Sequence, residues 1–148
     1  MSLSRALALT LTCAAALAAC GDDDGLSAED YREQGNAACE RYEADVRELP
    51  QPQSIEDVAP YAGKAQARLA ELIDELDELE PPSDLEEQHD QLIRLGRSGV
   101  QEIKKLEAAG ESGQQSEIEG ALQSAGDLDT QSDEVARELG LDACADES

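Results

Sequence analysis

Beyond residue 26, long stretches with apolar side chains at helical spacing alternate with short breaks rich in proline, glycine or serine. Apolar residues that recur every three or four positions fall on one face of an α-helix. In the second stretch, from about Ser54 to Leu79, the spacing of four and three is uninterrupted, as in helices that pack lengthwise. The breaks are residues 49–53 (LPQPQ), Pro81 with Pro82, and residues 110–113 (GESG). Four helical segments are therefore predicted.

Each segment has one face that we expect to point inward. In chain order these positions are Tyr31, Ala38, Tyr42, Val46 and Leu49; Val58, Ala62, Ala65, Leu69, Leu72, Leu76 and Leu79; Leu85, His89, Leu92, Gly96, Gly99, Ile103 and Leu106; and Ile118, Ala121, Ala125, Leu128, Ser132, Val135 and Leu139. Short connections force neighbouring helices to run antiparallel, so the pattern predicts an all-α fold, an up-down-up-down four-helix bundle. Its core is thin because many inward positions are Ala or Gly.

Helix boundaries also carry recognisable signals. Start signals of the S-x-x-[DE] kind are Ser27 with Asp30, Ser54 with Asp57, and Ser83 with Glu86, the last a full capping box. Pro60 lies where an early helical turn tolerates it, although a kink or a later start is open. Gly140 stands where a left-handed C-terminal cap is needed, and Leu141 would supply its hydrophobic contact.

The first nineteen residues have the pattern of an export signal. Arg5 is the only charged side chain before Asp22, and the apolar stretch after it is shorter than the ~20 residues of a membrane-spanning helix. The stretch from Leu17 to Cys20 (LAAC) resembles the lipobox of bacterial lipoproteins. The resemblance implies that Cys20 becomes the diacylated N-terminus and that Cys13, which fits a lipobox poorly, is removed. An ordinary cleaved secretory signal is the alternative.

This gives three regions: a signal peptide (1–19), an acidic tether (20–26) and a helical bundle domain (27–148). The bundle region is similar to small helical lipoproteins and secreted proteins of actinobacteria, through NAACERYEADVRELPQP, LEPPSDLEEQHDQL and ARELGLDAC. That resemblance implies a helical fold and no known activity. We expect the protein to be lipid-anchored to the cell membrane, facing the cell exterior or periplasm.

Cys39 and Cys144 are the remaining cysteines of the expected mature chain. An exported pair in an oxidising compartment indicates a structural disulfide. The tail after the fourth helix would have to fold back along the first helix to bring Cys144 to Cys39. A redox-active pair is the alternative, but the chain has no C-x-x-C motif.

Charge and composition exclude several classes of function. The chain has 35 acidic and 11 basic residues and a net charge of -24, which argues against a nucleic-acid partner. His89 is the only histidine, so a di-iron site cannot be assembled, and zinc ligation fails once the cysteines are oxidised. A Cys/His nucleophile pair lacks a free thiol. We expect His89 to be a hydrogen-bonded residue at the bundle end. The acidic runs at residues 22–25 and 127–138 fail as calcium loops. No metal, no cofactor and no enzymatic activity are predicted.

Two features of the third segment leave alternatives open. Arg94, Arg97, Lys104 and Lys105 form a basic stripe opposite the inward face. The stripe could dock an acidic partner, or a second copy through residues 74–80 (DELDELE); alternatively its members pair within the helix, Arg94 with Asp90 and Lys105 with Glu102. Gly96 and Gly99 indicate close helix packing, or else a hinge or a small ligand niche.

The function that these features favour is a lipid-anchored, non-catalytic helical module that contacts an unknown protein partner. The alternative is a lipoprotein that binds a small ligand or a cation, which the acidic surface would favour.

Overall fold

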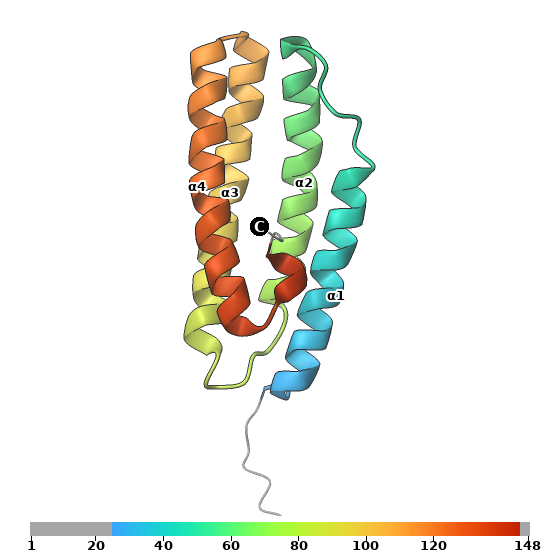
Figure 1. Ribbon diagram of the computed structural model, residues 1–148, viewed down its shortest axis with the longest axis vertical. Helices are drawn as coiled ribbons and strands as arrows, with labels where there is room; N and C mark the ends of the chain where they lie inside the picture. The colour runs from blue at the N-terminus through green and yellow to red at the C-terminus, as the bar shows by residue number, and fades with distance from the viewer. Residues whose placement is uncertain (1–24, 146–148) are drawn as a thin grey trace, which may run out of the picture.

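The computed structural model describes residues 25–145, and these form four long α-helices and two short 3₁₀ helices (Figure 1). The long helices are α1 (Ala28–Arg47), α2 (Val58–Asp77), α3 (Glu86–Ser112) and α4 (Gln115–Leu139). The short ones are η1 (Ile55–Asp57), before α2, and η2 (Asp142–Cys144), after α4. Successive long helices run antiparallel. The predicted all-α four-helix bundle with a Cys39–Cys144 disulfide is confirmed.

The bundle is open along one side. α3 packs along both α2 and α4, and α1 packs along α2. In a regular up-down bundle the first and fourth helices also pack against each other. Here α4 meets α1 mainly through η2, which folds back from the end of α4 onto α1 (Figure 1). The second half of α1 and the first half of α4 therefore stand apart (Figure 1).

The buried side chains form two separate clusters. One surrounds the disulfide and the start of α1, and its fully buried members include Tyr31, Leu139 and Leu141. The other lies at the opposite end of α2, α3 and α4, and contains Ala62, Leu106, Ala109, Ile118 and Ala121. Between the clusters, the expected inward positions are only half-buried: Leu69, Gly99, Ile103, Ala125 and Leu128. The core is thus interrupted halfway along the bundle.

Most of the expected inward faces are correct. In α2, the predicted positions Ala62, Ala65, Leu72 and Leu76 are buried. Two further core residues, Ile73 and Ile93, lie beside the predicted stripes and have 4% and 2% of their surface exposed. They widen the contact between α2 and α3 beyond a single seam.

Two of the expected helix ends are confirmed by hydrogen bonds. The Ser27 hydroxyl accepts a hydrogen bond of 3.1 Å from the backbone N–H of Asp30, so it caps α1. Gly140 ends α4 in the left-handed conformation, with φ 76°. The N–H of Leu141 donates to the Ala136 carbonyl and that of Gly140 to the Arg137 carbonyl, the two bonds of a Schellman motif. This cap reverses the chain toward α1.

One other expected boundary is wrong, and two are shifted. Ser83 does not cap α3, because the Leu85 N–H bonds the Pro82 carbonyl in a turn and the helix begins only at Glu86. The GESG segment does end α3, but only at its last glycine: Gly110 is helical and buried, and Gly113 caps the helix. A Cβ on Gly110 would lie 2.7 Å from the Ala59 backbone nitrogen, so close packing against α2 explains this glycine. After Ser54 the chain forms η1, and α2 starts later, at Val58.

Candidate functional site

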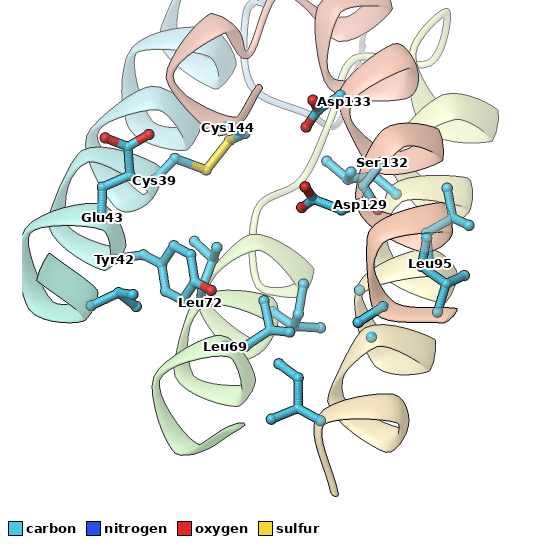
Figure 2. Close-up of a pocket in the computed structure, with 18 of the residues that line it drawn as sticks. Cys39, Tyr42, Glu43, Leu69, Leu72, Leu95, Asp129, Ser132, Asp133 and Cys144 are labelled. Atoms are coloured by element: carbon cyan, nitrogen blue, oxygen red, sulfur yellow. A yellow bond between two sulfur atoms is a disulfide. The ribbon is translucent and has the colours of Figure 1, made fainter. Parts of the chain in front are cut away.

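A groove of about 630 Å³ lies in the gap between the two core clusters. All four long helices and η2 line it, and its walls are mostly apolar. Figure 2 shows α1 with Tyr42 on one side and α4 with Asp129 on the other, above Leu69 and Leu72 of α2. Leu122 lines the groove and is 53% exposed, so the groove opens to solvent along α4. We call this space the central groove.

Small residues create the central groove. Gly99 on α3 and Ala125 and Gly126 on α4 line it at the level where a packed bundle would place large side chains. A Cβ on Gly126 would meet no atom within 4 Å, and one on Gly99 only Leu69, at an ordinary 3.4 Å. Neither glycine is packed tightly against a neighbouring helix. The predicted thin core is therefore a real cavity at this level.

Gly96 has the opposite role, although it lies only one turn from Gly99. A Cβ at Gly96 would overlap with Cδ1 of Ile73, a buried side chain of α2. Gly96 therefore allows α2 and α3 to approach closely, as one of the two sequence interpretations expected. Gly99 fits the other interpretation, because it borders the niche.

Acidic side chains outnumber basic ones among the residues that line the groove. Its ionisable lining residues are Glu43 and Arg47 of α1, and Asp129 and Asp133 of α4, three acids to one base. Arg47 forms an ion pair with Glu43 one turn earlier. Asp133 is buried, with 8% exposed, and Arg137 lies 3.5 Å from it. The α4 wall thus brings two carboxylates, four residues apart, to one face of the helix.

The disulfide closes the end of the groove that lies nearest η2. Cys39 is 1% exposed, and the Cα atoms of Cys39 and Cys144 are 5.0 Å apart, within the usual range for a disulfide. Both cysteines line the groove (Figure 2). The tail folds back along α1 as the sequence predicted, and the bridge links α1 to η2, which follows α4, at this end of the groove.

Two polar side chains of α1, which the sequence analysis did not single out, hold the tail beside the disulfide. The Asn36 amide donates to the Gly140 carbonyl at 3.1 Å and accepts from the Ala143 N–H at 2.8 Å. Arg32 Nε donates to the Leu139 carbonyl at 2.9 Å. We call these bonds, together with the disulfide, the C-terminal clasp. Asn is a poor helix former, so an Asn within the first predicted helical segment was the available sign that position 36 has a specific role.

His89 is a buried, hydrogen-bonded residue at the bundle end, as expected. Its Nδ1 and the Tyr31 hydroxyl are joined by a hydrogen bond of 3.0 Å. Burial lowers the pKa of His89, although the carboxylates of Asp90 and Asp77 act to raise it. Burial raises the pKa of Tyr31 to about 12. Both groups are therefore neutral at pH 7, and His89 lies outside the groove lining.

The basic stripe is exposed and only partly neutralised. Lys105 pairs with Glu102 at 2.6 Å, as one alternative expected. The expected pair of Arg94 with Asp90 does not form; instead Arg97 reaches across to Asp77 of α2 at 2.8 Å. Asp77 belongs to the acidic run at residues 74–80, so Arg97 uses part of that run within the same molecule. The side chains of Arg94 and Lys104 make no ion pair with any of residues 25–145.

The expected lipidation site, Cys20, lies outside the residues that the structure describes, as do Cys13 and the signal segment. The described chain begins at Gly25, which lies against Pro81. The Leu26 N–H donates to the Glu80 carbonyl at 2.8 Å, and its side chain packs against the disulfide-end cluster. The N-terminal segment thus enters the bundle beside the connection between α2 and α3.

Within residues 25–145, no three His, Cys, Asp or Glu side chains are grouped closely enough to hold a metal ion. None of the helices in this part of the chain combines the length and apolarity that a membrane crossing requires. Comparisons of the chain with models of protein families, with curated proteins and with solved structures find no match.

Proposed function

We propose that this protein is a lipid-anchored, non-catalytic binding protein of the cell exterior, and that it holds a small apolar ligand in the central groove. The observation that carries the proposal is the groove itself. A volume of about 630 Å³ with mostly apolar walls falls in the 300–1,000 Å³ range of small-molecule sites. Packed protein interiors contain few voids larger than a water molecule. The small-ligand alternative from the sequence therefore becomes the preferred function.

The proposed location is supported by two independent features. A disulfide that closes the fold is compatible with an oxidising compartment outside the cytoplasm. The LAAC stretch supplies a cysteine at the position that lipoprotein signals use. Two acyl chains on Cys20 would provide stable anchoring, where a single chain gives only marginal binding.

Anchoring at Cys20 would also orient the domain. The five residues from Cys20 to Asp24 span at most about 17 Å when fully extended. The end of the bundle nearest the membrane would then contain the start of α1 and the α2–α3 connection. The long axis of the groove follows the helices, so its far end would point away from the lipid surface.

Recovery of a bound molecule from the native protein tests the proposal. The protein would be purified from its own membranes, extracted with organic solvent, and the extract analysed by mass spectrometry. A Gly99→Leu variant should lose the bound molecule, because the added side chain enters the groove. Gly120→Leu is the matched control, since Gly120 lies on α4 outside the groove with open space around it. Equal recovery from both variants, or no bound molecule in any of them, would contradict the proposal.

A second candidate function is docking of an acidic protein partner on the basic stripe. It is favoured by Arg94 and Lys104, which are exposed and make no ion pair within the described chain. Reversal of both charges should leave the fold intact, since exposed charges of this kind contribute little to stability. Loss of a partner that co-purifies with the unmodified protein would support docking, and retention of that partner would exclude it.

A further inference from the structure

We infer that the ligand of the central groove is an amphipathic cation: an apolar body that lies along the groove and a positively charged group held by the α4 wall. This inference rests on the proposed function, because it identifies the chemical class of the molecule that the groove binds. The ligand class follows from the shape of the groove, the sign of the charges that line it and the aromatic side chain that faces them.

The shape of the groove fits an elongated small molecule. On α4 its lining runs from Leu122 to Asp133, about 16 Å at 1.5 Å per residue. A helix with side chains is about 10–12 Å thick, so a helical segment of this length would fill well over 1,000 Å³. The groove offers about 630 Å³. A molecule thinner than a helix, such as one with an alkyl or fused-ring body, therefore fits better than a docked helix.

The charges on the walls select the sign of the head group. The ion pair between Glu43 and Arg47 leaves the α1 wall without excess charge. The α4 wall contributes Asp129 and Asp133, one helical turn apart, and Figure 2 shows both carboxylates directed toward the space between α4 and α1. Asp133 forms an ion pair with Arg137 at 3.5 Å. With Arg137 counted beside Arg47, the carboxylates at the groove still outnumber the cationic groups by three to two. The groove therefore has a negative wall and attracts cations.

Tyr42 also favours a positively charged ligand. It lines the groove from α1, and its ring points into the space opposite the aspartates of α4 (Figure 2). Aromatic faces attract cations, and Tyr is among the side chains that bind quaternary ammonium groups. A cationic head in the groove thus meets two carboxylates on one wall and an aromatic ring on the other. An anionic amphiphile of the same length would meet like charge, on a chain whose net charge is -24.

Three probes that share a decyl tail and differ in the charge of the head group test the inference. Decyltrimethylammonium, decyl glucoside and decyl sulfate would be titrated, below their micelle concentrations, into the oxidised chain from Gly21 onward, which holds both core clusters and the C-terminal clasp. Isothermal calorimetry gives each affinity. We expect the cationic probe to bind at least tenfold more tightly than the anionic probe, with the neutral probe between them.

Paired variants separate the groove charges from the charge of the whole surface. The double variant Asp129→Asn/Asp133→Asn should lose at least tenfold in affinity for decyltrimethylammonium and keep its affinity for decyl glucoside. The matched control is Asp127→Asn/Glu134→Gln, which removes two exposed charges of the same helix that do not line the groove. This control should keep both affinities. Because Asp133 is buried, Asp129→Asn is also tested alone, since Asp129 is at an exposed position. We expect this variant to lose affinity for decyltrimethylammonium, but by less than the double variant.

The outcomes distinguish the inference from the proposed function. Equal binding of all three heads, abolished by Gly99→Leu, would overturn the charge preference and leave the groove as the binding site. An equal loss in the control double variant would also overturn it, because the attraction would then be general. If no probe binds, or if Gly99→Leu binds like the unmodified chain, both the inference and the proposed function fail. If a second copy of the chain or another protein occupied the groove, sedimentation would show a larger species, and formation of that species would displace the probe. This result would overturn the inference.

Discussion

Loss of the disulfide is expected to have a large effect on stability and a small effect on structure. The bridge joins residues 105 positions apart and so encloses almost all of the described chain. A double variant, Cys39→Ala/Cys144→Ala, removes it without placing a polar hydroxyl in the apolar cluster around Cys39, which is only 1% exposed. Reduction of the unmodified protein should produce the same change.

The expected magnitude follows from the length of the loop. Cross-linking a loop of about 100 residues restricts the unfolded chain by about 4.7 kcal/mol in the chain-entropy model, and removal of a native disulfide typically costs about 2–5 kcal/mol. Domains of this size have unfolding free energies of roughly 5–15 kcal/mol, so a folded state remains. At about 4 °C per kcal/mol for a domain of this size, the melting temperature should fall by roughly 8–20 °C.

The hydrogen bonds of the C-terminal clasp explain why the structure should survive. Asn36 and Arg32 still bind the chain around Gly140 when the sulfur atoms are separated. Circular dichroism at low temperature should therefore show the same helical spectrum in the oxidised, reduced and double-variant proteins. The assay is thermal melting of the three, with the double variant in reductant as the control that should not change further. A melting temperature that does not respond to reduction, or a loss of helix at low temperature, would refute this reasoning.

Three further predictions concern the stability of the fold. Asn36→Ala removes two hydrogen bonds to the tail, each worth about 1 kcal/mol, and should lower the unfolding free energy by about 2 kcal/mol in urea melts; an unchanged midpoint would contradict its role in the clasp. Gly96→Ala should destabilise by about 1–3 kcal/mol because its Cβ overlaps with Ile73, whereas Gly99→Ala should be neutral or stabilise by up to about 1 kcal/mol; the reverse order would show that the groove is misplaced. Because burial lowers the pKa of His89, the unfolded chain takes up its proton first, so His89 should make stability fall as pH drops through 6.5; the difference in unfolding free energy between wild type and His89→Gln should change across pH 5–8, and a constant difference would contradict this.

The fold was largely predictable because its main determinant is a local pattern. The repeat of Ala62, Ala65, Leu72 and Leu76 on one face of α2 depends only on the pitch of a helix, and these residues are buried as expected. The αL cap at Gly140 is a similar local rule. The capping box at Ser83 failed because Pro82 starts a hydrogen-bonded turn that delays the helix, and that competition is not visible from residue spacing.

The candidate site was predictable only in part. The sequence identified Gly99 and Ala125 as small residues on inward faces, which indicated a thin core. Whether such positions collapse into contact or leave a cavity depends on how far α4 lies from α1. That separation is set by η2 and the C-terminal clasp, through contacts of residues more than 100 positions apart, such as Asn36 with Ala143. Spacing along the chain carries no information about such a distance.

The most direct test of the central claim is to locate a bound probe by methyl NMR. In protein with labelled leucine methyl groups, decyltrimethylammonium should shift the signals of Leu69, Leu95 and Leu122, which line the central groove. The signals of Leu26 and Leu106, which lie outside it, should stay in place. Gly99→Leu should abolish the shifts. Shifts centred on Leu26 or Leu106, or the same shifts in the Gly99→Leu variant, would contradict the account of the groove as the binding site.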